Sequence, residues 1–268
     1  MKKLLPLLLS CLVLLAGSAW AETVLIAGED DWAPYSSIKK DRSGPEGFAV
    51  DVVREAFKTQ GVTAQFTVLP FTRCLRDAEI GKVVGCFDAT IIKSNEHTYH
   101  WHPTPLMFVE LTIFGRKDDP KSNVTLSDLE GKVVGTTIGY TYPTSFTENK
   151  KIKHFEANSD AQLVKMLANK RVDYVLLNGI PGYLLVRNDA QARDKLIRKG
   201  MVSVDGFWVA FSKNHKDGKR MSEVFEKGMQ ELHKNGKYKA MEAELAGRLK
   251  LPNEMILRPD PPAQGRAK

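Results

Sequence analysis

Charged and hydroxyl side chains recur within residues 69–97, at points where apolar segments end. Arg73 offers a guanidinium fork to an anion, Asp88 a carboxylate to a cation, and Thr90 a hydroxyl. Helical spacing over residues 71–80 predicts a helix between two strands, and ligands of open α/β sheets lie beyond the carboxyl ends of strands. We therefore expect a small ligand to bind here. The alternative is a solvated Arg73 and an Asp88 that caps a helix.

A second group of polar and aromatic residues follows the first predicted strand, residues 23–27. Asp30, Trp32 and Tyr35 come soon after this strand, and we expect them to form one wall of a pocket. The two aromatic rings could stack on a ligand. Packing at the surface around Pro34 would explain them equally well.

The coarse pattern is that of an α/β protein. At 268 residues the chain is longer than one average domain and suits two lobes. Apolar or alternating runs predict strands at residues 23–27, 65–69, 83–87, 174–177 and 207–211, and helical spacing predicts helices at residues 48–57, 71–80, 161–168 and 221–245.

Residues 1–21 have the pattern of a cleaved secretory signal. A pair of lysines precedes an apolar run over residues 4–16, and small residues end it as signal peptidase requires. We expect cleavage before Glu22 and export to the periplasm. Two less favoured alternatives are a membrane span, which needs about 20 apolar residues, and a lipoprotein site at Cys11.

The charge of the chain does not point to nucleic acid. Loss of the signal removes Lys2 and Lys3 from 39 basic residues and leaves 37 against 32 acidic ones, a net charge of +5. The basic residues are spread along the chain among acidic neighbours, so no basic stripe is expected.

Cys74 and Cys86 form an even pair in a chain bound for an oxidising compartment. They flank one short predicted helix, so a strand that returns beside the start of this helix could bring them together. We expect a disulfide that pins the loop carrying Arg73. The alternative is two buried free thiols.

Three histidines surround Trp101, at positions 97, 100 and 102. No acidic or cysteine ligand completes an obvious metal site with them, and no cysteine or histidine spacing indicates zinc. We expect this segment to be a surface loop, with no metal and no cofactor.

Several short motifs follow one another in a particular order. They are W-x-P-Y at residues 32–35, G-F-x-V-D-x-x-x-E-A-F at 47–57, G-K-V at 81–83, E-H at 96–97 ahead of P-x-P-L, and L-S-D-L-E-G-K-V-V-G at 126–135. In this order and spacing they resemble family 3 of the extracellular solute-binding proteins, the periplasmic receptors of polar amino-acid ABC transporters. The resemblance covers nearly the whole mature chain.

The resemblance implies a fold similar to the type II periplasmic binding proteins, with two α/β lobes joined by a two-strand hinge. Lobe 1 would comprise residues 22–110 and 207–268, and lobe 2 would comprise residues 111–206. The chain would cross between the lobes at residues 111–114 and 207–211.

The resemblance also implies where the second lobe meets a ligand. Residues 136–142 match a glycine and hydroxyl segment that leads into a helix, where free amides attract a carboxylate. Asn178 ends a strand that faces the cleft in the family. The expected ligand-binding residues are Asp30, Trp32, Tyr35, Phe71, Arg73, Asp88, Ala89, Thr90, His97, Gly139, Tyr140, Thr141 and Asn178.

The sequence departs from the family at two charged positions. Where relatives typically hold the ligand's carboxylate with arginine and its ammonium with aspartate, this chain has His97 and Asn178. Histidine lacks the charged planar fork of arginine. Either the ligand is not a plain α-amino acid, or Arg73 replaces the first group and Asp88 or Asp30 the second.

These observations favour a monomeric periplasmic receptor that closes on a small polar solute, an amino acid or related small carboxylate, and passes it to the membrane permease of an ABC importer. One alternative is a dehydratase-like enzyme on the same scaffold, for which His97, Glu96 and Asp88 are candidates without a catalytic constellation. Another is a ligand-sensing subunit of a membrane signalling protein.

Overall fold

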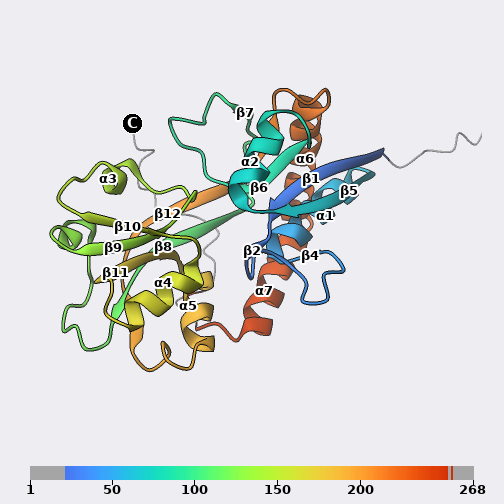
Figure 1. The fold of residues 1–268 in the computed structure, drawn as a ribbon. Coiled ribbons are helices and arrows are strands. Elements are labelled where there is room, and N and C mark those ends of the chain that lie inside the picture. The colour runs from blue at the N-terminus through green and yellow to red at the C-terminus, as the bar shows by residue number, and fades with distance from the viewer. Residues whose placement is uncertain (1–21, 253–254, 256–268) are drawn as a thin grey trace, which may run out of the picture.

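The computed structural model describes residues 22–252 and 255, which form two α/β lobes connected by two long strands (Figure 1). The predicted signal, residues 1–21, lies outside the described residues. Within the described part of the chain, no helix is long and apolar enough to span a membrane.

The first lobe is built from both ends of the described chain. Its elements are β1 (Glu22–Glu29), β2 (Asp31–Trp32), β3 (Ser36–Ile38), β4 (Pro45–Glu46), α1 (Phe48–Thr59), β5 (Val62–Leu69), α2 (Phe71–Glu79), β6 (Gly85–Ala89), β7 (Tyr99–His100), α6 (Gly218–Lys234) and α7 (Lys237–Leu249). The second lobe contains η1 (Leu126–Leu129), β9 (Val133–Thr137), α3 (Thr144–Thr147), β10 (Lys153–Ala157), α4 (Asp160–Ala168), β11 (Tyr174–Asn178) and α5 (Gly179–Asn188).

Two long strands, β8 (Met107–Arg116) and β12 (Leu196–Ser212), run from one lobe to the other (Figure 1). They pair antiparallel along their length and join the strands of both lobes in the order β10-β9-β11-β8-β12-β6-β1-β5. The two-lobed α/β fold expected from the sequence is confirmed. The proposed lobe limits at residues 110/111 and 206/207 fall inside these strands and stay a prediction.

Helix α1 shows how the sequence builds the core of the first lobe. Its apolar face is buried and consists of Phe48, Val52, Val53, Ala56 and Phe57. Phe57 packs against Phe211 and Phe225. Gly47 precedes the helix with φ of 132°, and a Cβ there would lie 2.2 Å from the carbonyl oxygen of Tyr35. Glycine is therefore required where the chain turns into α1 beneath Tyr35.

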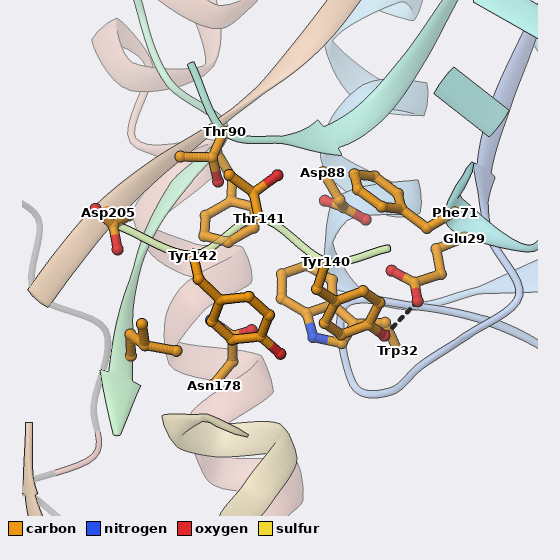
Figure 2. Close-up of a pocket in the computed structure, with 12 residues that line it drawn as sticks. Glu29, Trp32, Phe71, Asp88, Thr90, Tyr140, Thr141, Tyr142, Asn178 and Asp205 are labelled. Carbon is orange, nitrogen blue, oxygen red and sulfur yellow. Dashed lines mark hydrogen bonds between the residues drawn. The ribbon is translucent and has the colours of Figure 1, made fainter. Parts of the chain in front are cut away.

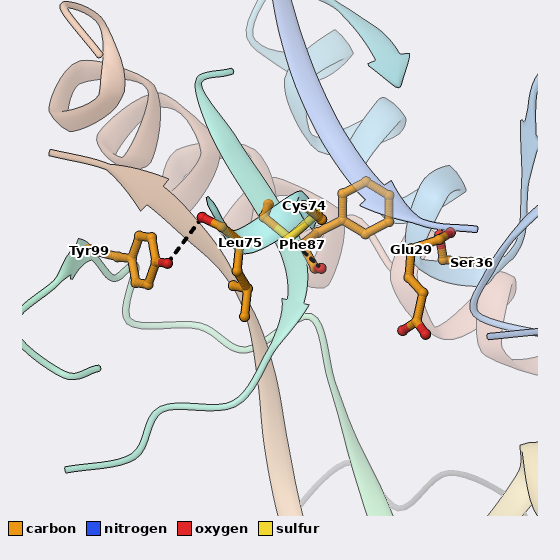
Figure 3. The surroundings of a disulfide bond; sticks show 7 residues. Glu29, Ser36, Cys74, Leu75, Phe87 and Tyr99 are labelled. Carbon is orange, nitrogen blue, oxygen red and sulfur yellow. Dashed lines mark hydrogen bonds between the residues drawn. A yellow bond between two sulfur atoms is a disulfide. The ribbon is translucent and has the colours of Figure 1, made fainter. Parts of the chain in front are cut away.

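A disulfide joins Cys74 of α2 to Cys86 of β6, which confirms the expected pairing (Figure 3). Both cysteines are buried. Leu75 follows Cys74 in the sequence, and its carbonyl oxygen accepts a hydrogen bond from the Tyr99 hydroxyl at 3.1 Å. The bridge fixes the start of α2 against the strand that carries Asp88 at its end.

Removal of this bridge is expected to destabilise the protein. A link that closes a loop of this size contributes about 3 kcal/mol by restricting the unfolded chain. The Cys74→Ala/Cys86→Ala variant should therefore unfold at a lower urea midpoint than the oxidised wild type. A reductant should lower the urea midpoint of the wild type and leave that of the variant unchanged. Equal midpoints for the variant and the oxidised wild type would contradict this expectation.

The histidine segment is only partly a surface loop. His97 is exposed, but His102 is buried between Phe211 and Phe225, and its Nε2 accepts a hydrogen bond from the Val209 amide at 2.9 Å. The Nδ1 atom has no hydrogen-bond partner among the described residues and lies 3.8 Å from Glu226. The expectation of a surface loop is thus wrong for His102, because an imidazole flanked by aromatic rings packs as part of the core.

Acid is expected to destabilise the fold through His102. Burial lowers the pKa of this imidazole to about 4, below its ordinary value of 6.5. The unfolded chain therefore binds the proton more readily, and stability is lost as the pH falls from about 6.5 to 4, by up to about 3 kcal/mol. Urea unfolding at pH 7 and pH 4.5 should show a smaller loss in His102→Gln than in the wild type.

The exposed His97 supplies the control. His97→Gln should retain the full acid sensitivity of the wild type, since its side chain is 91% exposed. If the loss of stability in acid were the same in His102→Gln as in the wild type, the buried imidazole would not be its cause.

Candidate functional site

A pocket lies between the lobes, where β1 and β6 end on one side and residues 140–142 follow β9 on the other (Figure 2). Carboxyl, hydroxyl, amide and aromatic groups line it. The lining residues are Glu29, Trp32, Phe71, Asp88, Thr90, Leu111, Tyr140, Thr141, Tyr142, Asn178, Asp205 and Phe207. Among these described residues there is no lysine or arginine.

Asp88 is the most unusual of the lining residues. It lies near the end of β6 with φ of 69°, a left-handed conformation that aspartate tolerates better than most residues. Its side chain is buried, and neither carboxyl oxygen has a hydrogen-bond partner among the described residues. Burial raises the pKa of this carboxyl well above its ordinary value. A buried polar group without a partner is rare and calls for an explanation.

Glu29 connects the lobes across the pocket. It is the last residue of β1, and its Oε1 accepts a hydrogen bond from the Tyr140 hydroxyl (Figure 2). Burial raises the pKa of Glu29 well above its ordinary value, the Tyr140 hydrogen bond opposes this, and neighbouring Asp88, Asp160 and Asp30 raise it further. The pocket thus contains a buried carboxyl whose charged neighbours have the same sign.

The connecting strand β12 and the second lobe contribute further acidic groups. Asp205 of β12 lines the pocket, and its Oδ2 accepts a hydrogen bond from the Ser203 hydroxyl at 2.5 Å. Burial raises its pKa. At the start of α4, Asp160 accepts a hydrogen bond from the Thr137 hydroxyl, and burial raises its pKa to about 6. Carboxyls of both lobes therefore approach the same cleft.

Aromatic rings form much of the remaining wall. Trp32 stacks on Phe207 with ring centroids 5.0 Å apart, and Phe71 meets Tyr140 edge to face at 6.0 Å. The Trp32 Nε1 donor is buried and has no partner in the described part of the chain. The space left between the walls is about 30 Å³, about the volume of one water molecule. A larger guest therefore needs the walls of the pocket to rearrange.

Seven of the expected ligand-binding residues line this pocket. They are Trp32, Phe71, Asp88, Thr90, Tyr140, Thr141 and Asn178. Their role in binding stays a prediction, but the fold gathers them from five separate stretches of the chain.

The other expected residues lie outside the lining. Tyr35 is fully buried behind Trp32, with ring centroids 4.7 Å apart, and Ala89 is buried beside Asp88. Asp30 is half-buried, and Gly139 lies against Thr72 of α2. His97 is exposed and contacts Glu96 at 3.3 Å.

Arg73 is also exposed and does not line the pocket. The reason is its place on α2, where Phe71, Cys74 and Ala78 form the buried face. At about 100° per residue, Arg73 lies on the opposite side from Phe71. We therefore do not include Arg73 in the proposed site.

Sequence reasoning missed five lining residues, namely Glu29, Leu111, Tyr142, Asp205 and Phe207. The position of Glu29 in the site could have been predicted from the sequence, because Glu29 lies just after the predicted strand at residues 23–27. Asp88 lies in the same way just after the predicted strand at residues 83–87. Asp205 gave no such signal, since it lies inside a strand of 17 residues.

In the described ranges, no group of three or more histidine, cysteine, aspartate or glutamate side chains is arranged to hold a metal ion. The acidic groups of the pocket are distributed over its two sides.

Sequence comparison identifies similar proteins. The profile of the bacterial extracellular solute-binding proteins, family 3, matches residues 24–247. The chain is 29% identical over 134 residues to the probable ABC transporter extracellular-binding protein YckB of Bacillus subtilis (strain 168). That stretch is 48% of this chain and 46% of YckB, so the match spans about half of the relative.

Structural comparison finds the same fold in solved structures. A histidine kinase sensor domain with similarity to periplasmic binding proteins superposes with a TM-score of 0.74 at 21% identity, over 84% of this chain and 96% of that one. Holo ArgBP from T. maritima superposes with a TM-score of 0.66 at 22% identity, over 79% of this chain and 90% of that one. AbpA from Streptococcus pneumoniae, bound to L-arginine, superposes with a TM-score of 0.70 at 19% identity, over 86% of this chain and 97% of that one. At these identities the likeness shows the fold alone.

Proposed function

Because this chain belongs to the bacterial extracellular solute-binding proteins, family 3, we propose that it is a periplasmic receptor that encloses a small polar solute between its lobes. The observation that carries the proposal is Asp88, a buried carboxyl that lines the interlobe pocket without a partner among the described residues. A polar ligand group would supply that partner.

The solute favours closure because it contacts both lobes at once. Asp88 and Thr90 approach it from the first lobe, and Thr141 and Asn178 from the second. A ligand that gains contacts from both sides binds the closed form more tightly and so raises its population. The Glu29–Tyr140 hydrogen bond already links the two sides at this place.

The receptor delivers its solute to the membrane permease of an ABC importer and acts as a monomer, after export directed by residues 1–21. The name of YckB, an ABC transporter extracellular-binding protein, supports the importer. The family is one of extracellular solute-binding proteins, so binding is preferred over a dehydratase-like reaction.

A ligand-sensing subunit is the second candidate, favoured by the likeness to a histidine kinase sensor domain. Such a subunit would bind its solute in the same cleft and differ in its membrane partner. Association of the loaded receptor with a permease, rather than with a kinase or cyclase, separates the two.

A thermal-shift panel tests the proposed function. The mature chain, refolded to remove carried ligand, is mixed with acidic, neutral and basic amino acids, small carboxylates and small amines. A ligand at 100 times its Kd stabilises by about 2.7 kcal/mol, which corresponds to several degrees. No shift with any compound would contradict binding of these classes, and turnover of a compound seen by mass spectrometry would favour an enzyme.

A further inference from the structure

We infer that the solute is a small organic dication without a carboxylate, held between aromatic rings by Asp88 and Glu29 of the first lobe and by Asp205 of the connecting strand β12. This inference rests on the proposed function, since it names the chemical class that the interlobe cleft accepts.

The charge of the lining disfavours a carboxylate on the ligand, although the Trp32 Nε1 donor, unpartnered among the described residues, could accommodate one neutral acceptor. Three of the twelve lining residues, Glu29, Asp88 and Asp205, are acidic, and no described lining residue carries a positive charge. A bound amino acid would place its carboxylate among these groups with no cation to pair with it. An unpaired charge in such a site is costly, because like charges repel and water is excluded.

The carboxyl of Asp88, which has no partner among the described residues, is a second reason to expect a cationic or hydrogen-bond-donating group on the ligand. This reason does not depend on how many acidic residues line the pocket. Its two carboxyl oxygens are buried and lack partners within the described chain, and a carboxylate is an acceptor at both oxygens. The disulfide at Cys86 anchors the strand that carries Asp88. An ammonium or guanidinium N–H group would satisfy both oxygens.

The aromatic walls favour an organic cation. Trp32, Phe71, Tyr140 and Phe207 all line the same pocket as the carboxyls. Ring faces attract ammonium and guanidinium groups, and their edges cover the apolar methylenes between two such groups. A bare metal ion would gain little from these rings.

The Tyr140 contact indicates where the second positive group binds. In this structure the Tyr140 hydroxyl donates to Glu29 and the remaining space is about 30 Å³. In the proposed complex a second cationic group replaces the Tyr140 hydroxyl as donor to Glu29. A ligand with positive groups at both ends therefore fits better than a monoamine.

Matched ligand pairs test the inference by isothermal titration at pH 7.5. Agmatine is arginine without its carboxylate, and 1,5-diaminopentane is lysine without its carboxylate. Each amine is expected to bind at least about 30-fold more tightly than its parent amino acid, the size of effect caused by an unpaired buried charge. Butylamine, with one positive end, should bind more weakly than 1,4-diaminobutane.

The outcomes separate the inference from the proposed function. Tighter binding of an amino acid, of any acidic or neutral solute, or of a metal ion alone would overturn the inference and leave the receptor proposal intact. Binding of no solute in the full panel would overturn both.

Asp88→Asn provides the test at the residue level. Asparagine tolerates the left-handed backbone at this position, so the variant is expected to fold. It should bind agmatine at least about 30-fold more weakly than the wild type. Asp194→Asn, at an exposed position of the second lobe, is the matched control and should bind as the wild type does. Equal agmatine affinity of Asp88→Asn and the wild type would overturn the role of Asp88.

Discussion

The ligand-free Asp88→Asn variant is expected to unfold at a higher temperature than the wild type at pH 7. In the wild type, a buried carboxyl without a partner must either carry an unpaired charge or take up a proton, and burial raises its pKa well above the ordinary value. A neutral amide avoids this cost. The amide is still a polar group without a partner among the described residues, but it cannot ionise, and removing the cost of a buried ionisable carboxyl contributes about 1–3 kcal/mol, which corresponds to a melting temperature about 2–10 °C higher.

The pH dependence of this gain identifies its cause. Because the pKa of Asp88 is raised in the folded state, the wild type loses stability relative to the variant as the pH rises above about 4, the ordinary value for aspartate. Scanning fluorimetry at pH 5 and pH 7 should show a larger difference at pH 7. A variant less stable than the wild type at both values would contradict the description of Asp88 as an uncompensated carboxyl.

The affinity for a small dication is expected to rise steeply with pH. Burial raises the pKa of Glu29, Asp88 and Asp205, and raises that of Asp160 to about 6. A bound cation favours the ionised carboxyls, so binding releases protons and is weakened as the pH falls. The groups that face these carboxyls are hydroxyls or other acids, namely Tyr140, Thr137, Ser203, Tyr35, Asp30 and Asp31.

Each proton released changes the affinity by up to tenfold per pH unit. The Kd for agmatine should therefore fall at least about tenfold between pH 5 and pH 7, over which range an amine with a pKa near 10 stays charged. Titration of Asp88→Asn should give a shallower slope, because one titrating group is gone. A Kd that is constant or rises with pH in the wild type would contradict the expected proton release.

The sequence predicted the arrangement of the site better than its chemistry. Apolar runs and helical spacing located β1, α1, α2 and β6, because each buries one face or both, and alternation located β5, which is only partly buried. Since ligands of such sheets lie beyond strand ends, Asp88 and Thr90 were identified as candidates, the resemblance to the family added Asn178, and all three line the pocket.

The direction of individual side chains was harder to predict. Arg73 has the right residue type close to a strand end, but the buried face of α2 is set by Phe71, Cys74 and Ala78, and this turns Arg73 to solvent. Asp205 lies within a strand whose length could not be inferred from the apolar residues 207–211. Glu29 and Tyr140 meet only because the two lobes face each other, a contact between residues 111 positions apart.

A crystal structure of the chain with agmatine would test the account most directly. A ligand nitrogen is expected about 2.7–2.9 Å from a carboxyl oxygen of Asp88, with the Tyr140 hydroxyl displaced from Glu29 and the ligand in contact with both lobes. Agmatine bound outside the cleft, or an Asp88 still without a partner in the complex, would contradict it.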